Sequence, residues 1–188
     1  MGEQADRQID TLYRVYSNDL FMYALGLGFD RETAMDAIHD VFYKLCLDEN
    51  IVKGVTNIRF YLLRSLKNRL LDINKLKREI PGLSIGTIAE EIPFSIHVNV
   101  EDLMIENEER EKIRLQVEKL LESLTDRQRE VIYLRFTQDC DYEEIALLMH
   151  ISVPSCRKLF HKAITSLKKN PPYFSILLFF LLRDAFFA

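Results

Sequence analysis

The chain has 188 residues, of which 48% are hydrophobic, enough for one or two small domains with packed cores. Its formal net charge is only -4, so any affinity for nucleic acid must come from local clusters of cations. The cysteines are three in number, scattered and outside any paired metal spacing, which indicates reduced thiols packed in helices of a cytoplasmic protein. The polar amino terminus is no signal peptide, and we expect no metal site.

Two amphipathic helices are expected between Asp6 and Leu47. The first carries apolar and aromatic residues at helical spacing and ends at Gly28. The second begins at Asp30 and has acidic residues in its early turns. Its apolar side consists of Ile38, Val41, Phe42 and Leu45. We expect one side of this helix to pack and the other to dock on a partner.

A loop from Asp48 to Thr56 leads into a long basic helix from Asn57 to Glu79. Between its first and last arginine this helix carries seven cations against the single acid Asp72, a local charge of +6. Such a face is typical of nucleic-acid binding. Phe60 and Tyr61 could stack on unpaired bases, but their spacing with the leucines fits core packing equally well. We assign Phe60 to the core and leave Tyr61 open.

The segment from Ile80 to Val100 breaks every period with prolines, glycines and serines, and is interpreted as a linker. A strongly acidic helix from Glu101 to Leu121 follows, with its glutamates expected in solvent. The next helix begins at Thr125, which can form a capping box with Gln128 before a stripe of core residues. These helices are expected to support the basic helix that comes after them.

Near the carboxyl end the pattern predicts a helix, a tight turn and a second helix. Asp141 and Glu144 resemble a capping box at the start of the first helix. His150 and Ile151 supply the turn, and Ser152 can cap the second helix. Two short helices are therefore expected to meet at a corner.

The second of these helices has one apolar and one cationic face. The apolar residues recur at spacings of three and four. No acid lies between Val153 and Lys169, and the cations on the other face are Arg157, Lys158, Lys162, Lys168 and Lys169. A helix-turn-helix that reads DNA and an ordinary helical hairpin with a solvated lysine face fit this pattern about equally.

The final segment contains YFSILLFFLL, a mainly apolar run of ten residues. It is shorter than the roughly twenty residues that a membrane span needs, so we expect no transmembrane span. Our prediction is a short helix packed on the protein's own surface. The alternative is an exposed patch that meets a partner protein or an inner-membrane surface.

Taken in order, these motifs resemble RNA polymerase sigma factors of the extracytoplasmic-function (ECF) group in the sigma-70 family. The family's first-domain pattern A-x-D-x-x-Q-x-V-F is matched by Ala34, Asp36, Val41 and Phe42, with His39 where glutamine is usual. A later segment of that domain is matched by Tyr61, Leu62, Asn68 and Asp72, with Tyr61 where tryptophan is commoner. The second domain's motifs are matched by Ser123, Leu124, Arg129, Val131, Tyr142, Glu144, Ile145, Ala146, Ile151, Ser152 and Val153. Pro154 and Cys156 depart from the usual reading helix, which bears on the promoter sequence more than on the function.

The resemblance implies an all-α fold of two helical domains, sigma2-like and sigma4-like with a helix-turn-helix, joined by an irregular linker. The sigma2-like domain would span residues 6–79, the linker 80–100, the sigma4-like domain 101–170 and the apolar tail 171–188. The first domain would dock on core RNA polymerase and recognise and melt the minus-10 promoter element. The second domain would recognise the minus-35 element.

The resemblance also assigns three sets of residues. Those for polymerase binding are Asp36, His39, Asp40 and Phe42. Those for the minus-10 element are Arg59, Tyr61, Arg64, Lys67, Asn68, Lys75, Lys77 and Arg78, and the loop over residues 48–56 would capture an unstacked base. Those for the minus-35 element are Ser152, Pro154, Ser155, Arg157, Lys158, His161 and Lys162, with arginine or lysine donating to guanine or phosphate.

The function expected is that of an alternative sigma factor, cytoplasmic, with core RNA polymerase, promoter DNA and an anti-sigma factor as partners. The alternative is a polymerase-independent helix-turn-helix transcription regulator, which would leave the basic helix over residues 57–79 unexplained. The sequence has no Gly-rich phosphate loop and no H-E-x-x-H motif, and its four histidines are scattered. We therefore expect no enzymatic activity, cofactor or small-molecule substrate.

Overall fold

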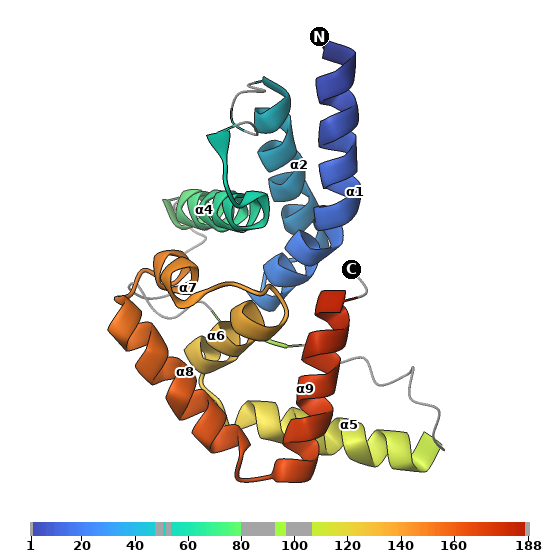
Figure 1. The fold of residues 1–188 in the computed structure, drawn as a ribbon, viewed down its shortest axis with the longest axis vertical. Coiled ribbons are helices and arrows are strands. Elements are labelled where there is room, and N and C mark those ends of the chain that lie inside the picture. Colours follow the sequence, from blue (N-terminus) through green and yellow to red (C-terminus); the bar gives the residue numbers. More distant parts are fainter. Residues whose placement is uncertain (1, 48–50, 52–53, 80–92, 97–106, 187–188) are drawn as a thin grey trace. The chain divides into compact units, whose positions relative to one another are not determined.

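The computed structural model describes residues 2–47, 51, 54–79, 93–96 and 107–186, and every regular element of these residues is an α-helix (Figure 1). The helices fall into two compact units. Unit 1 contains α1 (Gly2–Gly26), α2 (Arg31–Leu47) and α4 (Ile58–Glu79). Unit 2 contains α5 (Asn107–Glu122), α6 (Asp126–Phe136), α7 (Tyr142–Leu148), α8 (Val153–Leu167) and α9 (Pro171–Phe186). The predicted all-α class is confirmed.

The turn between α1 and α2 in unit 1 follows the predicted signals. Gly28 has a φ of +80°, a left-handed conformation that glycine adopts without the clash of a Cβ atom. Asp30 then accepts a hydrogen bond from the Thr33 backbone N–H at 2.8 Å through Oδ1, which satisfies an amide in the first turn of α2. The chain therefore reverses within a few residues, and α2 can pack along α1.

The core of unit 1 lies where α2 contacts both α1 and α4. Each helix contributes residues that are almost fully buried, and these include Leu20, Tyr23, Ile38, Leu45, Leu62, Leu63, Leu66 and Leu70. Burial of one such side chain contributes about 1.5–3 kcal/mol to folding. The contribution of all three helices explains why α4 keeps its position although its outer face is strongly basic.

The helix starts of unit 2 are capped as the sequence predicts. The Thr125 hydroxyl accepts from the Gln128 N–H while the Gln128 side chain accepts from the Thr125 N–H, a complete capping box. Asp141 and Glu144 form the same reciprocal pair at the start of α7. Ser152 accepts from the Ser155 N–H at the start of α8. These caps satisfy amides that have no acceptor within their own helix.

The corner between α7 and α8 is a Schellman motif. The Ile151 N–H donates to the Ala146 carbonyl at 3.0 Å, and the His150 N–H donates to the Leu147 carbonyl at 3.4 Å. His150 has a φ of +52°, at the position where glycine is usual. The left-handed residue stops α7 and redirects the chain, so that Ser152 can begin α8 immediately.

Part of the segment predicted as a linker packs into unit 2. Phe94 is 1% exposed, and its ring lies 5.4 Å from that of Tyr133, centroid to centroid. Its N–H donates to Asp126, and its carbonyl accepts from the Arg129 Nε at 2.6 Å. Arg129 also donates to the carbonyls of Leu121 and Leu124. An apolar side chain and two hydrogen bonds of the Phe94 backbone therefore hold residues 93–96, which lie within the predicted linker, against α6.

The carboxyl-terminal segment forms α9, which contacts α5 and α6. Leu177 and Leu181 are buried, as expected for a helix packed on the protein's own surface, whereas Phe179 remains 55% exposed. None of the helices among the described residues combines the length and apolarity that a membrane crossing requires.

Two of the cysteines lie in helices as predicted, and the third does not. Cys46 is exposed on α2, and Cys156 is buried in α8. Cys140 is buried in the turn between α6 and α7, where its N–H donates to the Leu134 carbonyl at 3.0 Å. All three are free thiols.

The left-handed backbone at His150 leads to a stability prediction. A glycine there avoids the Cβ clash but has more conformational freedom to lose on folding, so His150→Gly should stabilise unit 2 by about 0.5 kcal/mol. His150→Val should destabilise it by about 1 kcal/mol, because a β-branched side chain fits this backbone region poorly. Urea denaturation of the full chain, followed by the NMR signals of α7 amides, measures both changes. Equal stability of the two variants would contradict the stated cause.

Candidate nucleic-acid and polymerase interfaces

The predicted minus-35 residues share one exposed surface at the amino-terminal end of α8. All seven are exposed, from the cap at Ser152 to Lys162. The opposite side of the helix is held by the buried Cys156, Ala163 and Leu167, which explains why α8 contacts both α6 and α7. The helix therefore presents its cations outward while its apolar face is fixed in unit 2.

The thiol of Cys156 belongs to the buried side of this helix. Burial raises its pKa, and the nearby Glu143 carboxylate raises it further, against a smaller opposing effect of Arg157. Cys156 is therefore a protonated packing residue at neutral pH and not a reactive thiol.

The Arg157 guanidinium contacts two side chains of α7. Its Cζ lies 5.3 Å from the centroid of the Tyr142 ring, and its Nη2 lies 3.5 Å from the Glu143 Oε1. The Tyr142 ring also meets the edge of Phe160, with centroids 5.7 Å apart, and the Arg135 guanidinium lies 5.7 Å from its centroid. We call Arg135, Tyr142, Glu143 and Arg157 the α7 cation cluster.

Sequence reasoning assigned only Arg157 of this cluster to a site. Tyr142 was recognised as a motif residue, whereas Glu143 and Arg135 were not singled out. The contacts join residues from α6, α7 and α8, and no single helical period relates them. The one available signal was the aromatic residue Tyr142 directly after the Asp141 cap.

The predicted minus-10 residues on α4 are divided between surface and core. Arg64, Asn68 and Lys75 are exposed, and Arg59 and Tyr61 are half-buried. The side chains of Lys77 and Arg78 lie outside the described part of the chain, as does most of the loop over residues 48–56. The Arg59 guanidinium lies 5.8 Å from the centroid of the Tyr16 ring. Phe60, assigned to the core, is half-buried.

Lys67 differs from the other predicted minus-10 residues because it is only 6% exposed. It stands four residues after Leu63 and three before Leu70, and this spacing puts it on the core-facing stripe of α4. Lys67 is one of the seven cations counted along the predicted helix over residues 57–79. Its helical position nevertheless puts it on the side of α4 that faces the core. Its ammonium does not lie on the exposed basic surface of α4.

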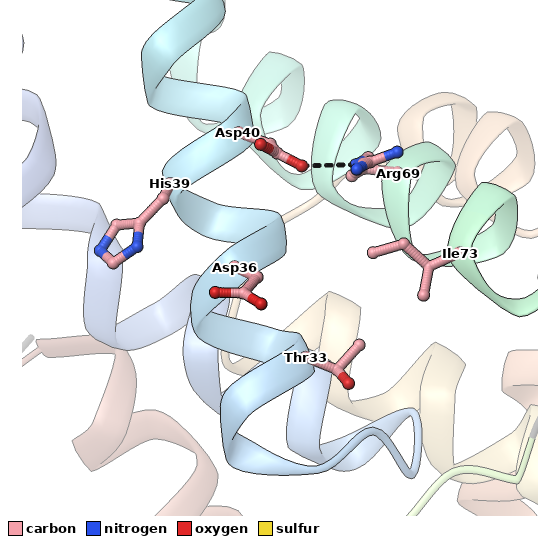
Figure 2. Close-up of a pocket in the computed structure, with 6 residues that line it drawn as sticks. All are labelled: Thr33, Asp36, His39, Asp40, Arg69 and Ile73. Carbon is pink, nitrogen blue, oxygen red and sulfur yellow. Dashed lines mark hydrogen bonds and ion pairs between the residues drawn. The ribbon is translucent and has the colours of Figure 1, made fainter.

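Three of the predicted polymerase-binding residues lie around a hollow between α2 and α4. The hollow has a volume of about 420 Å³ and is lined by Thr33, Asp36, His39, Asp40, Arg69 and Ile73 (Figure 2). Asp40 accepts from the Arg69 Nε at 2.7 Å, which links the two helices. His39 extends towards α1, where its Nε2 lies 3.3 Å from the Tyr13 hydroxyl. The polar side of α2 is therefore accessible beside an ion pair that connects it to α4.

Phe42 is the exception among the predicted polymerase-binding residues. It is 5% exposed, and its ring packs edge-on against Tyr13 with centroids 5.0 Å apart. The apolar period of α2 had already placed Phe42 on the packing side. Its position in the core means that Phe42 does not lie on the exposed side of α2 that was predicted to dock.

Among the described residues, no group of three or more His, Cys, Asp or Glu side chains is arranged to hold a metal ion. The two basic faces and the corner of α7 and α8 define a helical protein with a helix-turn-helix module in its second unit. Arg157 and Lys158 are exposed cations in the second turn of α8, and Lys162 is an exposed cation one turn further along.

Comparisons with known proteins identify this class more closely. Residues 114–167 match the family described as Sigma-70, region 4. The ECF RNA polymerase sigma factor SigM of Bacillus subtilis (strain 168) is 22% identical over 161 residues, which cover 85% of this chain and 93% of SigM. The RNA polymerase sigma factor YlaC of the same organism is 26% identical over 163 residues, which cover 86% of this chain and 91% of YlaC.

A solved structure has the same fold. It is the sigma factor RpoE from Bartonella quintana in complex with the anti-sigma factor NepR, with a TM-score of 0.59 and 18% identity. The similarity covers 87% of this chain and 96% of that one. The match to sigma-70 region 4 covers most of the helix-turn-helix unit, and the two relatives that align along most of the chain are sigma factors, one of them of the ECF group.

The burial of Phe42 separates a core role from a docking role. Phe42→Ala should lower the free energy of unfolding of unit 1 by about 3–5 kcal/mol, because it removes a large buried ring. Tyr43→Ala is the matched control, since the adjacent aromatic residue is 63% exposed and its loss should change stability by less than about 0.5 kcal/mol. Urea denaturation of both variants gives the comparison. Similar stability for the two would show that Phe42 is not part of the core.

Proposed function

We propose that this protein is an alternative sigma factor of the ECF type, which binds core RNA polymerase and directs it to specific promoters. The observation that carries the proposal is the helix-turn-helix of α7 and α8, which coincides with the match to sigma-70 region 4 and exposes all seven predicted reading residues. The protein itself is non-catalytic and acts in the cytoplasm. Polymerisation chemistry belongs to the core enzyme.

In this proposal unit 2 reads the minus-35 element. The amino-terminal end of a recognition helix lies in the major groove, where arginine can donate two hydrogen bonds to guanine. Arg157 and Lys158 stand in the second turn of α8 and are exposed. Lys162 stands one turn further along and can contact phosphate. The exposed cations support both base reading and backbone positioning.

Unit 1 has two tasks in the proposal. The accessible side of α2, with Asp36, His39 and Asp40, docks on core RNA polymerase. The basic face of α4, with Arg64, Asn68 and Lys75 exposed, holds the promoter backbone at the minus-10 element while the duplex opens. The Asp40–Arg69 ion pair supports this division because it connects the docking helix to the DNA-facing helix.

Neither DNA-facing surface needs to bind tightly by itself. Core polymerase would hold both units at promoter spacing, so that engagement of one element raises the effective concentration of the other. This arrangement suits a chain whose net charge is only -4 but which carries two separate clusters of cations. An anti-sigma factor is the proposed regulatory partner.

Reconstituted run-off transcription tests the function. Purified core polymerase with genomic fragments should yield discrete new transcripts only when this chain is added. Arg157→Glu should abolish them, because it replaces a donor in the reading helix with a carboxylate facing DNA. Lys112→Glu is the control, since Lys112 is also an exposed cation but lies on α5, away from the reading helix.

Two results would contradict the sigma-factor proposal. One is transcription that is equally lost with Lys112→Glu. The other is tight, sequence-specific binding by the chain alone with no transcript in the presence of core polymerase. The second result would identify a polymerase-independent transcription regulator.

The role proposed for α4 gives a separate prediction. Changing both Arg64 and Lys75 to Ala should slow promoter opening about tenfold or more, because two backbone contacts are lost at the melting element. A template with a pre-melted minus-10 region should restore most of the rate, and permanganate reactivity of unpaired thymines measures the opening. If the pre-melted template gives no recovery, the two residues act in a step other than melting.

A further inference from the structure

The exposed Arg157 is held in place by α7 before any DNA is present. Tyr142 and Glu143 are consecutive residues of α7, and both contact the same guanidinium. A cation over an aromatic ring and an exposed ion pair are each weak when they occur alone. Together they restrict a long side chain that would otherwise sample many rotamers, and this reduces the entropy that Arg157 loses on binding.

Tyr142 is itself fixed from two other directions. The edge contact with Phe160 comes from α8, and the Arg135 guanidinium comes from the last turn of α6. Arg135 is held in turn by the Cys140 carbonyl, to which its Nη1 donates at 2.9 Å. The ring that supports Arg157 is therefore part of the packed corner and not a mobile surface residue.

The Glu143 carboxylate affects whether Arg157 binds a DNA phosphate or a base edge. A DNA phosphate near the guanidinium would also be near the Glu143 carboxylate, and the two negative groups would repel. A guanine edge offers the neutral acceptors O6 and N7, which fit the two donors of arginine. The carboxylate therefore disfavours backbone contact by Arg157 more than it disfavours contact with a base.

Building on the proposed sigma-factor function, we infer that Tyr142 and Glu143 are positioning residues that direct Arg157 to a guanine edge in the minus-35 major groove. They set the specificity of the recognition helix from the neighbouring helix. Arg135 supports them through the Tyr142 ring. The α7 cation cluster thus determines the base preference of Arg157, whereas Lys158 and Lys162 contribute to the affinity for DNA.

The test measures base preference at each minus-35 position and the salt dependence of binding. The full chain, alone and with core polymerase, is assayed on a library of duplexes with every single substitution in the element. The wild-type protein should prefer guanine at one position, and Arg157→Ala should remove that preference. Tyr142→Leu should reduce the preference about tenfold without changing the salt slope, whereas Tyr142→Phe, which keeps the ring, should retain it.

Glu143→Gln provides a second variant on an exposed side chain, where folding is not at risk. It should strengthen binding to all sequences, reduce the guanine preference and steepen the salt slope by up to about one unit, because Arg157 can then contact phosphate. The opposing changes in affinity and specificity distinguish positioning from a merely structural role.

Three outcomes would overturn the inference. Tyr142→Leu could weaken binding to all sequences equally and lower the salt slope, as loss of a phosphate contact does. Tyr142→Phe could lose as much preference as Tyr142→Leu. The wild-type chain could show no Arg157-dependent guanine preference in either format. If that preference is present in the chain alone but polymerase gives no transcription, the proposed function fails and the positioning role stands.

Discussion

The left-handed backbone at His150 is the constraint on which the helix-turn-helix of unit 2 depends. It ends α7, lets the Ile151 N–H return to the Ala146 carbonyl, and leaves Ser152 free to cap α8 without an intervening loop. A longer connection would allow the two helices to change their crossing. The short corner instead determines which side of α8 packs on α6 and α7 and which side carries its cations outward.

The basic surfaces of this protein depend on which helix face carries the cations, and the net charge of the chain does not reveal them. The excess of acid over base in the whole chain coexists with two basic surfaces, on α4 and α8, that lie in separate units. Each surface is supported by a layer of apolar residues behind it, and the Asp40–Arg69 pair uses one of the α4 cations within the fold. A count of cations along α4 therefore overstates what the helix can offer to phosphate.

Two residues that match the family motifs, Arg129 and Phe42, stabilise the fold. Arg129 binds three backbone carbonyls and Asp126, and so joins residues 93–96 and the turn before α6 to one core. Phe42 is a core ring beneath the docking side of α2. In both cases a residue of the motif stabilises the fold of its own unit.

From the sequence alone one could determine the helical class, the caps at Thr125, Asp141 and Ser152, and the exposed cationic face of α8, because these depend on local hydrogen bonding and helical periodicity. Only the tertiary structure decided that Phe94 is buried with its carbonyl bound to Arg129, and that Tyr142 and Glu143 contact Arg157. The physical reason is that burial and side-chain pairing across helices depend on how the helices cross. No period within a single helix encodes that crossing.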